Sequence, residues 1–317
     1  MRIIVFPISL LLLLPLRLRA QGSSLAPSPQ PLAPSYVPHR VYDTRHKQFI
    51  DFETLVSRVS TAGLVFVGEQ HDDPATHRME LALLEGIARR RDSVVLALEM
   101  FERDVQPLLD AYLAGDSSEA ELLRSGRPWK NYADYRPLVE LARAKGWPLV
   151  ASNVPRPLAS LVGRSGLGAL DTLAPQIRGE VAAAIDCPKD AYYRNFEQAM
   201  GSLAGHGPAP AIGDSPEVRM GRMYQAQCLK DETMGESVAR VWRPGRLVVH
   251  YNGSFHSDFR LGTAARAGRR APAASLLVVT AIPVPELDGV KPSKQDRKRA
   301  DYLLYVLAAV KPDTARR

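Results

Sequence analysis

Short runs of consecutive apolar residues alternate along the chain with longer segments whose apolar residues recur every three or four positions. The short runs are GLVFVGE, SVVLALEMF, WPLVASNVPR, GRLVVHYNGSFH and ASLLVVTAIPV. Strands that are apolar at consecutive positions are usually covered on both faces, which is typical of parallel sheets. The pattern therefore predicts an α/β fold, in which a mostly parallel sheet is flanked by helices.

The helices between these strands have recognisable ends. Asp73 and Pro74 form a start signal for a helix over DPATHRMELALLEGIARRR. The segments RDVQPLLDAYLAG and YRPLVELARAKG end at Gly115 and Gly146, and glycine is common just beyond a helix C-terminus. We expect a helix to follow each of the first strands.

The first twenty residues differ from the rest of the chain. MRIIVFPISLLLLLPLRLRA is apolar from Ile3 to Leu16 and ends in Ala20, which is the pattern of a secretory signal peptide. An uncleaved membrane anchor is the alternative. Removal of residues 1–20 lowers the formal net charge from +7 to +4, which is too small to indicate a nucleic-acid partner. We therefore expect an exported protein that does not bind nucleic acid.

The remainder divides into three parts by composition. Residues 21–40 are rich in Pro and Ser, which predicts a flexible linker. Residues 155–245 contain helical patterns, and the Gly/Pro-rich loop AGHGPAPAIGDSPE, without clear strands. We interpret this stretch as an inserted helical subdomain. The discontinuous α/β domain then consists of residues 41–154 and 246–312.

The chain contains two cysteines, Cys187 and Cys228, both inside the predicted helical subdomain. Disulfides form readily in exported proteins. The pairing also requires the two Cα atoms to lie within about 7 Å, which the sequence does not show. A disulfide and two free thiols both remain open at this point.

Polar side chains gather where the predicted strands end. These residues are Glu69, His71, Glu99, Asn153, Tyr251 and His256. In open parallel sheets, ligands bind at the carboxyl ends of the strands. If the strands are neighbours, the six side chains should line one pocket.

Several kinds of chemistry are open to such a pocket. Glu69, His71 and His256 are residue types that hold a divalent transition metal. Glu99 could instead act as a base in general acid–base catalysis. The same groups could also position a bound cofactor. The sequence contains no zincin, nucleophile-elbow, phosphate-loop or dinucleotide motif that would narrow the choice.

Five blocks in order resemble the ChaN-type haem-binding proteins of the Tiki/TraB/erythromycin-esterase-like superfamily. They are FVGEQHDDPATH, LALEMFERDVQPLLDAYLAG, WKNYADYRPLVELARAKGWPLVASNVPR, YQAQCLKDETMGESVAR and VVHYNGSFHSDFRLGTAAR. The resemblance extends from about residue 42 to about residue 283. It implies a parallel sheet flanked by helices with a smaller helical domain, in a protein of the bacterial periplasm or outer membrane that serves haem and iron uptake.

The resemblance also implies a cofactor and a partner. It implies a homodimer that holds two stacked haems, with a tyrosine ligating iron and a histidine of the second copy nearby. Tyr193, Tyr224 and Tyr251 are the candidates, because phenolate ligates ferric iron in some haem sites. ChaN proteins are typically lipoproteins, but no cysteine follows the signal segment here. Lipid attachment is therefore not supported.

Two functions follow from these observations. The first is a non-enzymatic haem-binding protein of haem or iron uptake, with contacts to outer-membrane uptake machinery. The second is a metal-dependent hydrolase, similar to the proteases and esterases of the superfamily, that uses the strand-end Glu and His residues.

Overall fold

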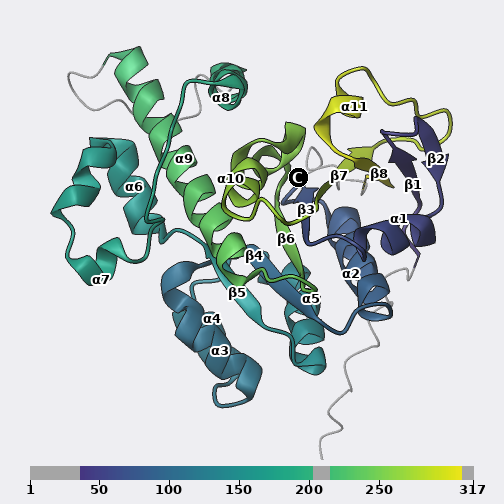
Figure 1. Ribbon diagram of the computed structural model, residues 1–317, viewed down its shortest axis with the longest axis horizontal. Helices are drawn as coiled ribbons and strands as arrows, with labels where there is room; N and C mark the ends of the chain where they lie inside the picture. The colour runs from purple at the N-terminus through teal and green to yellow at the C-terminus, as the bar shows by residue number, and fades with distance from the viewer. Residues whose placement is uncertain (1–35, 203–214, 309–317) are drawn as a thin grey trace, which may run out of the picture. The chain divides into compact units, whose positions relative to one another are not determined.

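The computed structural model describes residues 36–202 and 215–308 (Figure 1). The predicted signal peptide, most of the predicted linker and most of the Gly/Pro-rich loop lie outside the described residues. The described residues from Val37 onward belong to one compact unit. Within these ranges, none of the helices combines the length and hydropathy needed to cross a bilayer.

The described residues form an eight-stranded sheet in the order β2-β1-β8-β7-β3-β6-β4-β5. Its strands are β1 (His39–Asp43), β2 (Gln48–Ile50), β3 (Leu64–Glu69), β4 (Val94–Glu102), β5 (Leu149–Asn153), β6 (Leu247–Gly253), β7 (Leu276–Val284) and β8 (Tyr302–Leu307). Every pair from β8 to β5 is parallel, whereas β1 pairs antiparallel with β2 and β8. The predicted α/β class with a mostly parallel sheet is confirmed.

Helices cover both faces of the sheet. They are α1 (Phe52–Val59), α2 (Pro74–Ala88), α3 (Gln106–Ala114), α4 (Glu119–Ser125), α5 (Tyr132–Lys145), α6 (Arg156–Ser165), α7 (Pro175–Arg178), α8 (Ala191–Ser202), α9 (Pro216–Val241), α10 (Gly262–Arg270) and α11 (Asp296–Arg299). Short 3-10 turns are η1 (Arg103–Val105), η2 (Leu167–Thr172), η3 (Ser254–His256) and η4 (Asp258–Arg260). The core on one face includes residues of α1, α2, α3 and α5, and the core on the other includes residues of α9 and α10.

The structure has helix ends at Asp73, Gly115 and Gly146, as the sequence predicts. The Asp73 carboxylate accepts a hydrogen bond from the Thr76 backbone N–H at 2.7 Å and caps the start of α2. Gly115 and Gly146 follow α3 and α5 with φ of 87° and 63°, a left-handed conformation that favours glycine. Two strand boundaries differ from the sequence pattern: β4 continues three residues beyond Glu99, and β1 begins at His39, inside the predicted linker.

Alternation along the strands decides which face each functional residue meets. Val67 of β3 belongs to the core under α2, so Glu69, two residues later, points to the same face. Ala97 of β4 belongs to the core under α9 and α10, so Glu99 points to that face. The carboxyl ends of β3 and β4 therefore direct their glutamates to opposite sides of the sheet.

The described parts of residues 155–245 are helical and carry no strand. In Figure 1, α9 runs from the neighbourhood of α8 past α6 to the side of α10. Its C-terminal half contributes Val238 to the core on the sheet, and its N-terminal half packs against α8 through Tyr224. Cys187 and Cys228 form a disulfide, with Cα atoms 5.8 Å apart, that ties the segment before α8 to α9.

Candidate functional site

The first group of buried ionisable residues lies between β3, α2 and α5. The Glu69 carboxylate is 1% exposed, accepts a hydrogen bond from the Tyr135 hydroxyl at 2.7 Å, and lies 2.5 Å from His71 Nδ1. His77 Nδ1 lies 3.2 Å from Glu69 Oε2 and 3.1 Å from Glu80 Oε2. We call these five residues the β3–α2 group.

The charge state of this group follows from burial and its imidazoles. Burial opposes ionisation of Glu69, but hydrogen bonds from His71 and His77 outweigh it and lower its pKa to about 2. Burial also opposes protonation of His77, yet the two carboxylates beside it raise its pKa to about 11. Burial and the charge of Glu69 raise the pKa of Glu80.

The second group lies on the other face of the sheet, between β4, α9 and the segment after β6. His256 Nε2 is 3.3 Å from Glu99 Oε1, and His256 Nδ1 is 2.7 Å from Asp231 Oδ1. Asp231 also accepts hydrogen bonds from the Tyr192 hydroxyl at 2.5 Å and the Thr263 hydroxyl at 2.8 Å. We call these five residues the β4–α9 group.

His256 is held as a cation by its neighbours. Burial alone would lower its pKa, but the carboxylates of Glu99 and Asp231 raise it to about 10. Burial likewise disfavours the ionised form of Glu99, but His256, His71 and the Gly253 backbone N–H, which donates to Glu99 at 2.7 Å, lower the pKa of this carboxyl. The group is therefore a buried ion-pair chain.

Solvent reaches His71 at this edge of the sheet. Its side chain is 42% exposed, whereas those of Glu69 and His256 are 0% and 8% exposed. Its ring packs edge-on against Trp129 and lies against Gly253, where an added Cβ would come within 2.5 Å of Nε2. Glycine at this position lets the imidazole lie over the strand end.

The structure brings the six predicted pocket residues to one edge of the sheet, where His71 interacts electrostatically with Glu69, Glu99 and His256. Asn153 donates from Nδ2 to the Glu99 carbonyl at 3.1 Å and so supports the end of β4. Tyr251 is fully buried on the α2 face, where its hydroxyl donates to the Glu80 carbonyl at 3.0 Å. Glu69 and His256 belong to different groups because His256 pairs with Glu99, which lies on the opposite face of the sheet from Glu69.

The proposed metal set Glu69, His71 and His256 does not converge in this structure. Among the described residues, the three acidic or histidine side chains whose ligand atoms lie within 4.8 Å of one another are Glu69, His77 and Glu80. His71 instead places its Nδ1 on Glu69 and its Nε2 near Gly253. The role of these residues in a metal site remains a hypothesis.

Sequence reasoning missed Asp231, His77 and Glu80, although a signal was present. Asp231 continues the line of buried residues Tyr224, Cys228, Gly235 and Val238 along α9, at spacings of three and four that also predict burial. On α2, the buried positions His77, Glu80, Leu84 and Ile87 follow the same spacing. A charged residue in an apolar stripe was the available clue.

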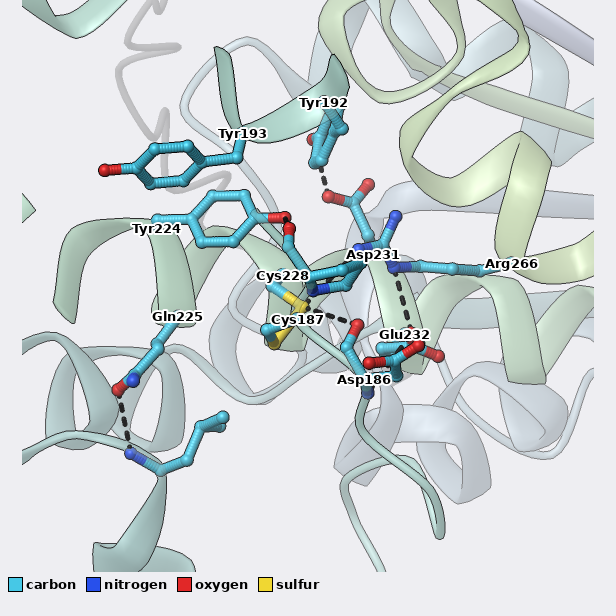
Figure 2. The surroundings of a disulfide bond; sticks show 12 residues. Asp186, Cys187, Tyr192, Tyr193, Tyr224, Gln225, Cys228, Asp231, Glu232 and Arg266 are labelled. Atoms are coloured by element: carbon cyan, nitrogen blue, oxygen red, sulfur yellow. Dashed lines mark hydrogen bonds and ion pairs between the residues drawn. A yellow bond between two sulfur atoms is a disulfide. The ribbon is translucent and has the colours of Figure 1, made fainter. Parts of the chain in front are cut away.

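An aromatic cluster adjoins the disulfide, and Figure 2 shows three of its members, Tyr192, Tyr193 and Tyr224, beside the bond. Its buried members are Tyr192, Phe196, Tyr224 and Cys228, and its half-buried members are Cys187, Tyr193, Met200, Met220, Met223, Phe255 and Leu261. The Tyr192 ring turns its hydroxyl toward Asp231, whereas Tyr193 and Tyr224 pack together with ring centroids 4.8 Å apart. We call these eleven residues the α8–α9 cluster.

The three candidate tyrosines have different surroundings. The Tyr224 hydroxyl donates to the Pro188 carbonyl at 2.7 Å, and its ring is 3% exposed. The Tyr251 hydroxyl is enclosed in the core. Tyr193 is half-buried, and its hydroxyl donates to the surface carboxylate of Glu197 at 3.1 Å. Of the three phenols, Tyr193 is the one whose hydroxyl bonds an exposed side chain.

A cleft of about 350 Å³ adjoins this cluster. Its lining consists of Tyr192, Asn195, Gln198, Ala199, Phe255, Asp258, Phe259 and Gln295. The lining has no basic side chain and includes the carboxylate of Asp258. An anionic ligand would therefore find no counter-charge among the lining residues.

The fold and the two edge groups define an α/β protein with buried carboxylate–histidine clusters at the carboxyl edge of a parallel sheet. The chain belongs to the family described as haem-binding uptake, Tiki superfamily, ChaN, whose sequence model matches residues 55–267. The resemblance noted in the sequence is thus confirmed. No curated protein matches the chain significantly.

Several solved structures are similar to this chain. One, described as cofacial haem binding to ChaN of Campylobacter jejuni, is 16% identical, with 84% of this chain and 96% of that chain covered and a TM-score of 0.64. A Bacillus cereus protein is 10% identical, covering 81% of this chain and 91% of that one at a TM-score of 0.45. An erythromycin esterase mutant in its open conformation is 13% identical. The match covers 83% of this chain and 81% of that one, with a TM-score of 0.42. The first match supports the fold, and the other two are too distant to support more.

Proposed function

We propose that this protein binds haem on the α8–α9 cluster and acts in haem or iron uptake. The main support is membership of the haem-binding uptake family over residues 55–267. The solved ChaN protein of the same fold is described as binding haem cofacially, and the present chain covers 96% of it. The proposal extends that property to this chain.

The residues of the α8–α9 cluster fit a flat apolar ligand that carries iron and two carboxylates. Half-buried Met200, Met220 and Met223 offer polarizable apolar surface. Tyr193 offers a phenol, and phenolate is a known ligand of ferric haem. The Lys189 ammonium lies 5.4 Å from the centroid of the Tyr193 ring, where it could pair with a haem propionate. Haem bound here would supply the iron, and the chain would supply the ligand and the apolar cover.

We assign the iron ligand to Tyr193 rather than to Tyr224 or Tyr251. A ligand must exchange its present hydrogen bond for iron without opening the core. Tyr193 would give up only Glu197, whereas Tyr224 would leave the Pro188 carbonyl without its donor. Tyr251 would have to leave the sheet core altogether.

The test is an absorption titration of the protein with ferric haem. Tyr193→Phe keeps the ring but removes the ligand oxygen, so the phenolate charge-transfer band should disappear and affinity should fall. Tyr224→Phe, on the ring that packs edge-on against Tyr193, is the matched control and should keep the band. A wild-type protein without saturable binding would refute the proposed function, and an unchanged spectrum in Tyr193→Phe would refute only the ligand assignment.

We further infer export to the bacterial periplasm, a homodimer that encloses two haems, and delivery to or from outer-membrane uptake machinery. The apolar leader in residues 1–20 supports export, and the cofacial haem binding described for the Campylobacter jejuni protein supports the dimer. Light scattering with and without haem tests the assembly. A monomer in both conditions would contradict the dimer.

A hydrolase at the sheet edge is the second candidate function. It is favoured by His256, which lies between the carboxylates of Glu99 and Asp231, and by solvent-exposed His71 at the same edge. Glu99 would act as the base in this scheme. Hydrolysis of model peptides or esters should then be abolished by Glu99→Gln and His256→Ala. Equal activity in wild type and both variants would exclude it.

A further inference from the structure

Glu69, His77 and Glu80 are three buried side chains from two elements that meet at one point. The side chains of Glu69 and Glu80 are 0% and 1% exposed, and that of His77 is 3% exposed. Glu69 is the last residue of β3, and the other two lie three residues apart on one face of α2. One ligand atom of each lies within 4.8 Å of the other two.

The hydrogen bonds of the chain do not satisfy this cluster. Glu69 Oε2 and Glu80 Oε1 are buried and have no hydrogen-bond partner within the described part of the chain. The ion pairs seen there for the two carboxylates are with imidazoles only. Two buried carboxylates require more compensation than a shared imidazole gives, because a buried anion without full pairing is costly.

The distances suit a metal better than a shared proton. A charged N–H···O bond is about 2.7–2.9 Å long, whereas His77 Nδ1 lies 3.2 Å and 3.1 Å from the two carboxylate oxygens. Ligand atoms about 2.1 Å from a four- to six-coordinate ion lie about 3.0–3.4 Å from one another. The observed separations match the edges of such a coordination polyhedron.

The surroundings also resemble the supporting contacts of metal ligands. His77 Nε2 lies 3.2 Å from the His71 carbonyl, which directs Nδ1 to the carboxylates. The Tyr135 hydroxyl donates to Glu69 Oε1, which leaves Oε2 directed at His77. A ligating histidine typically donates its second nitrogen to a carbonyl, and ligating carboxylates are themselves hydrogen-bonded.

We propose that Glu69, His77 and Glu80 bind one divalent transition-metal ion, which ties β3 to α2. One imidazole and two carboxylates suit zinc or manganese, and the charge of the ion balances the two carboxylates. This site differs from a set that includes His71 and His256, and it is independent of haem binding on the α8–α9 cluster. The bound ion would fix the end of β3, which lies two residues before His71.

The test uses haem-free full-length protein stripped with EDTA and then supplied with Zn²⁺ or Mn²⁺. Metal content per chain after gel filtration and the melting temperature are measured. We expect one ion per chain and a higher melting temperature for the wild type. Glu80→Gln and His77→Gln should weaken binding at least about tenfold. The matched controls are Glu53→Gln, at an exposed carboxylate, and His46→Gln, at an exposed imidazole, and both should bind the ion as the wild type does.

Several outcomes would overturn the site. They are a wild type with no stoichiometric ion and no change in melting temperature, or binding that is kept in both Glu80→Gln and His77→Gln. Should the two ligand variants fail to fold, X-ray absorption of the zinc-loaded wild type decides the question. One imidazole with oxygen ligands supports the site, and two or more imidazoles overturn it.

Discussion

His256→Gln should destabilise the protein strongly, because it leaves two buried carboxylates without their shared cation. Glu99 and Asp231 are 4% and 0% exposed, so solvent does not replace the imidazolium. Removing one partner of a buried ion pair typically costs about 3–5 kcal/mol. The rise of the His256 pKa from 6.5 to about 10 corresponds to a stabilisation of the same size. At about 2–4 °C per kcal/mol, the melting temperature should fall by about 6–20 °C.

The pH dependence of this difference gives a second measurement. The folded pKa of His256 is raised, so its contribution is complete below pH 6.5 and is lost as pH rises toward 10. The folded pKa of Glu99 is lowered, so its contribution is complete above pH 4.5 and is lost in acid. The difference in the free energy of unfolding between wild type and His256→Gln should thus be greatest between pH 4.5 and 6.5. It should become smaller at lower and at higher pH.

The assay is thermal unfolding followed by circular dichroism from pH 4 to pH 10. His46→Gln is the control, because His46 pairs with Asp43 while 53% exposed and should contribute at most about 1 kcal/mol. A variant His256→Gln that melts within 2 °C of the wild type at pH 6, with the same pH profile, would refute the ion-pair chain.

Further predictions concern packing and the disulfide. Gly253→Ala should cost about 1–3 kcal/mol in urea unfolding and displace the His71 ring, because the new Cβ would lie 2.5 Å from Nε2. Gly168→Ala meets no atom within 4 Å and should change stability by less than about 0.5 kcal/mol; equal effects of both substitutions would contradict the argument. Replacing both Cys187 and Cys228 by Ala should cost about 4 kcal/mol from the loop closed over 41 residues, and dithiothreitol should lower the melting temperature of the wild type only.

Much of the central fold could be predicted from local pattern. The run that became β3 is apolar at consecutive positions because both faces of this strand are covered, and Asp73 marks the start of α2 by a bond to its own helix. The short edge strands β1 and β2 were not predicted. They have five and three residues, so too few alternations mark them, and their pairing partners lie at the other end of the chain or across a turn.

The candidate site could be predicted only in part, because its partners depend on tertiary packing. Glu69, Glu99 and His256 stand out at the strand ends. Asp231 looks like a solvent-facing charge in KDET, but it is buried in the fold, where Tyr192 of α8 and Thr263 of α10 donate hydrogen bonds to it. His77 lies six residues from His71, a spacing that argues against one helical face. His71, however, lies before α2, whereas His77 lies on α2. The two imidazoles therefore contact Glu69 from different segments.

Tyr192 and Tyr193 are neighbours on α8, but each belongs to the site of a different candidate function. Tyr193 packs on Tyr224 at the surface of the α8–α9 cluster, whereas the next phenol back along α8 donates to Asp231 in the β4–α9 group. Successive residues of a helix point about 100° apart, so one helix can serve a surface ligand and a buried ion-pair chain at once. Haem ligation by Tyr193 would therefore leave the hydrogen bond from Tyr192 to Asp231 in place. Different single substitutions should then abolish haem binding and any hydrolysis at the sheet edge.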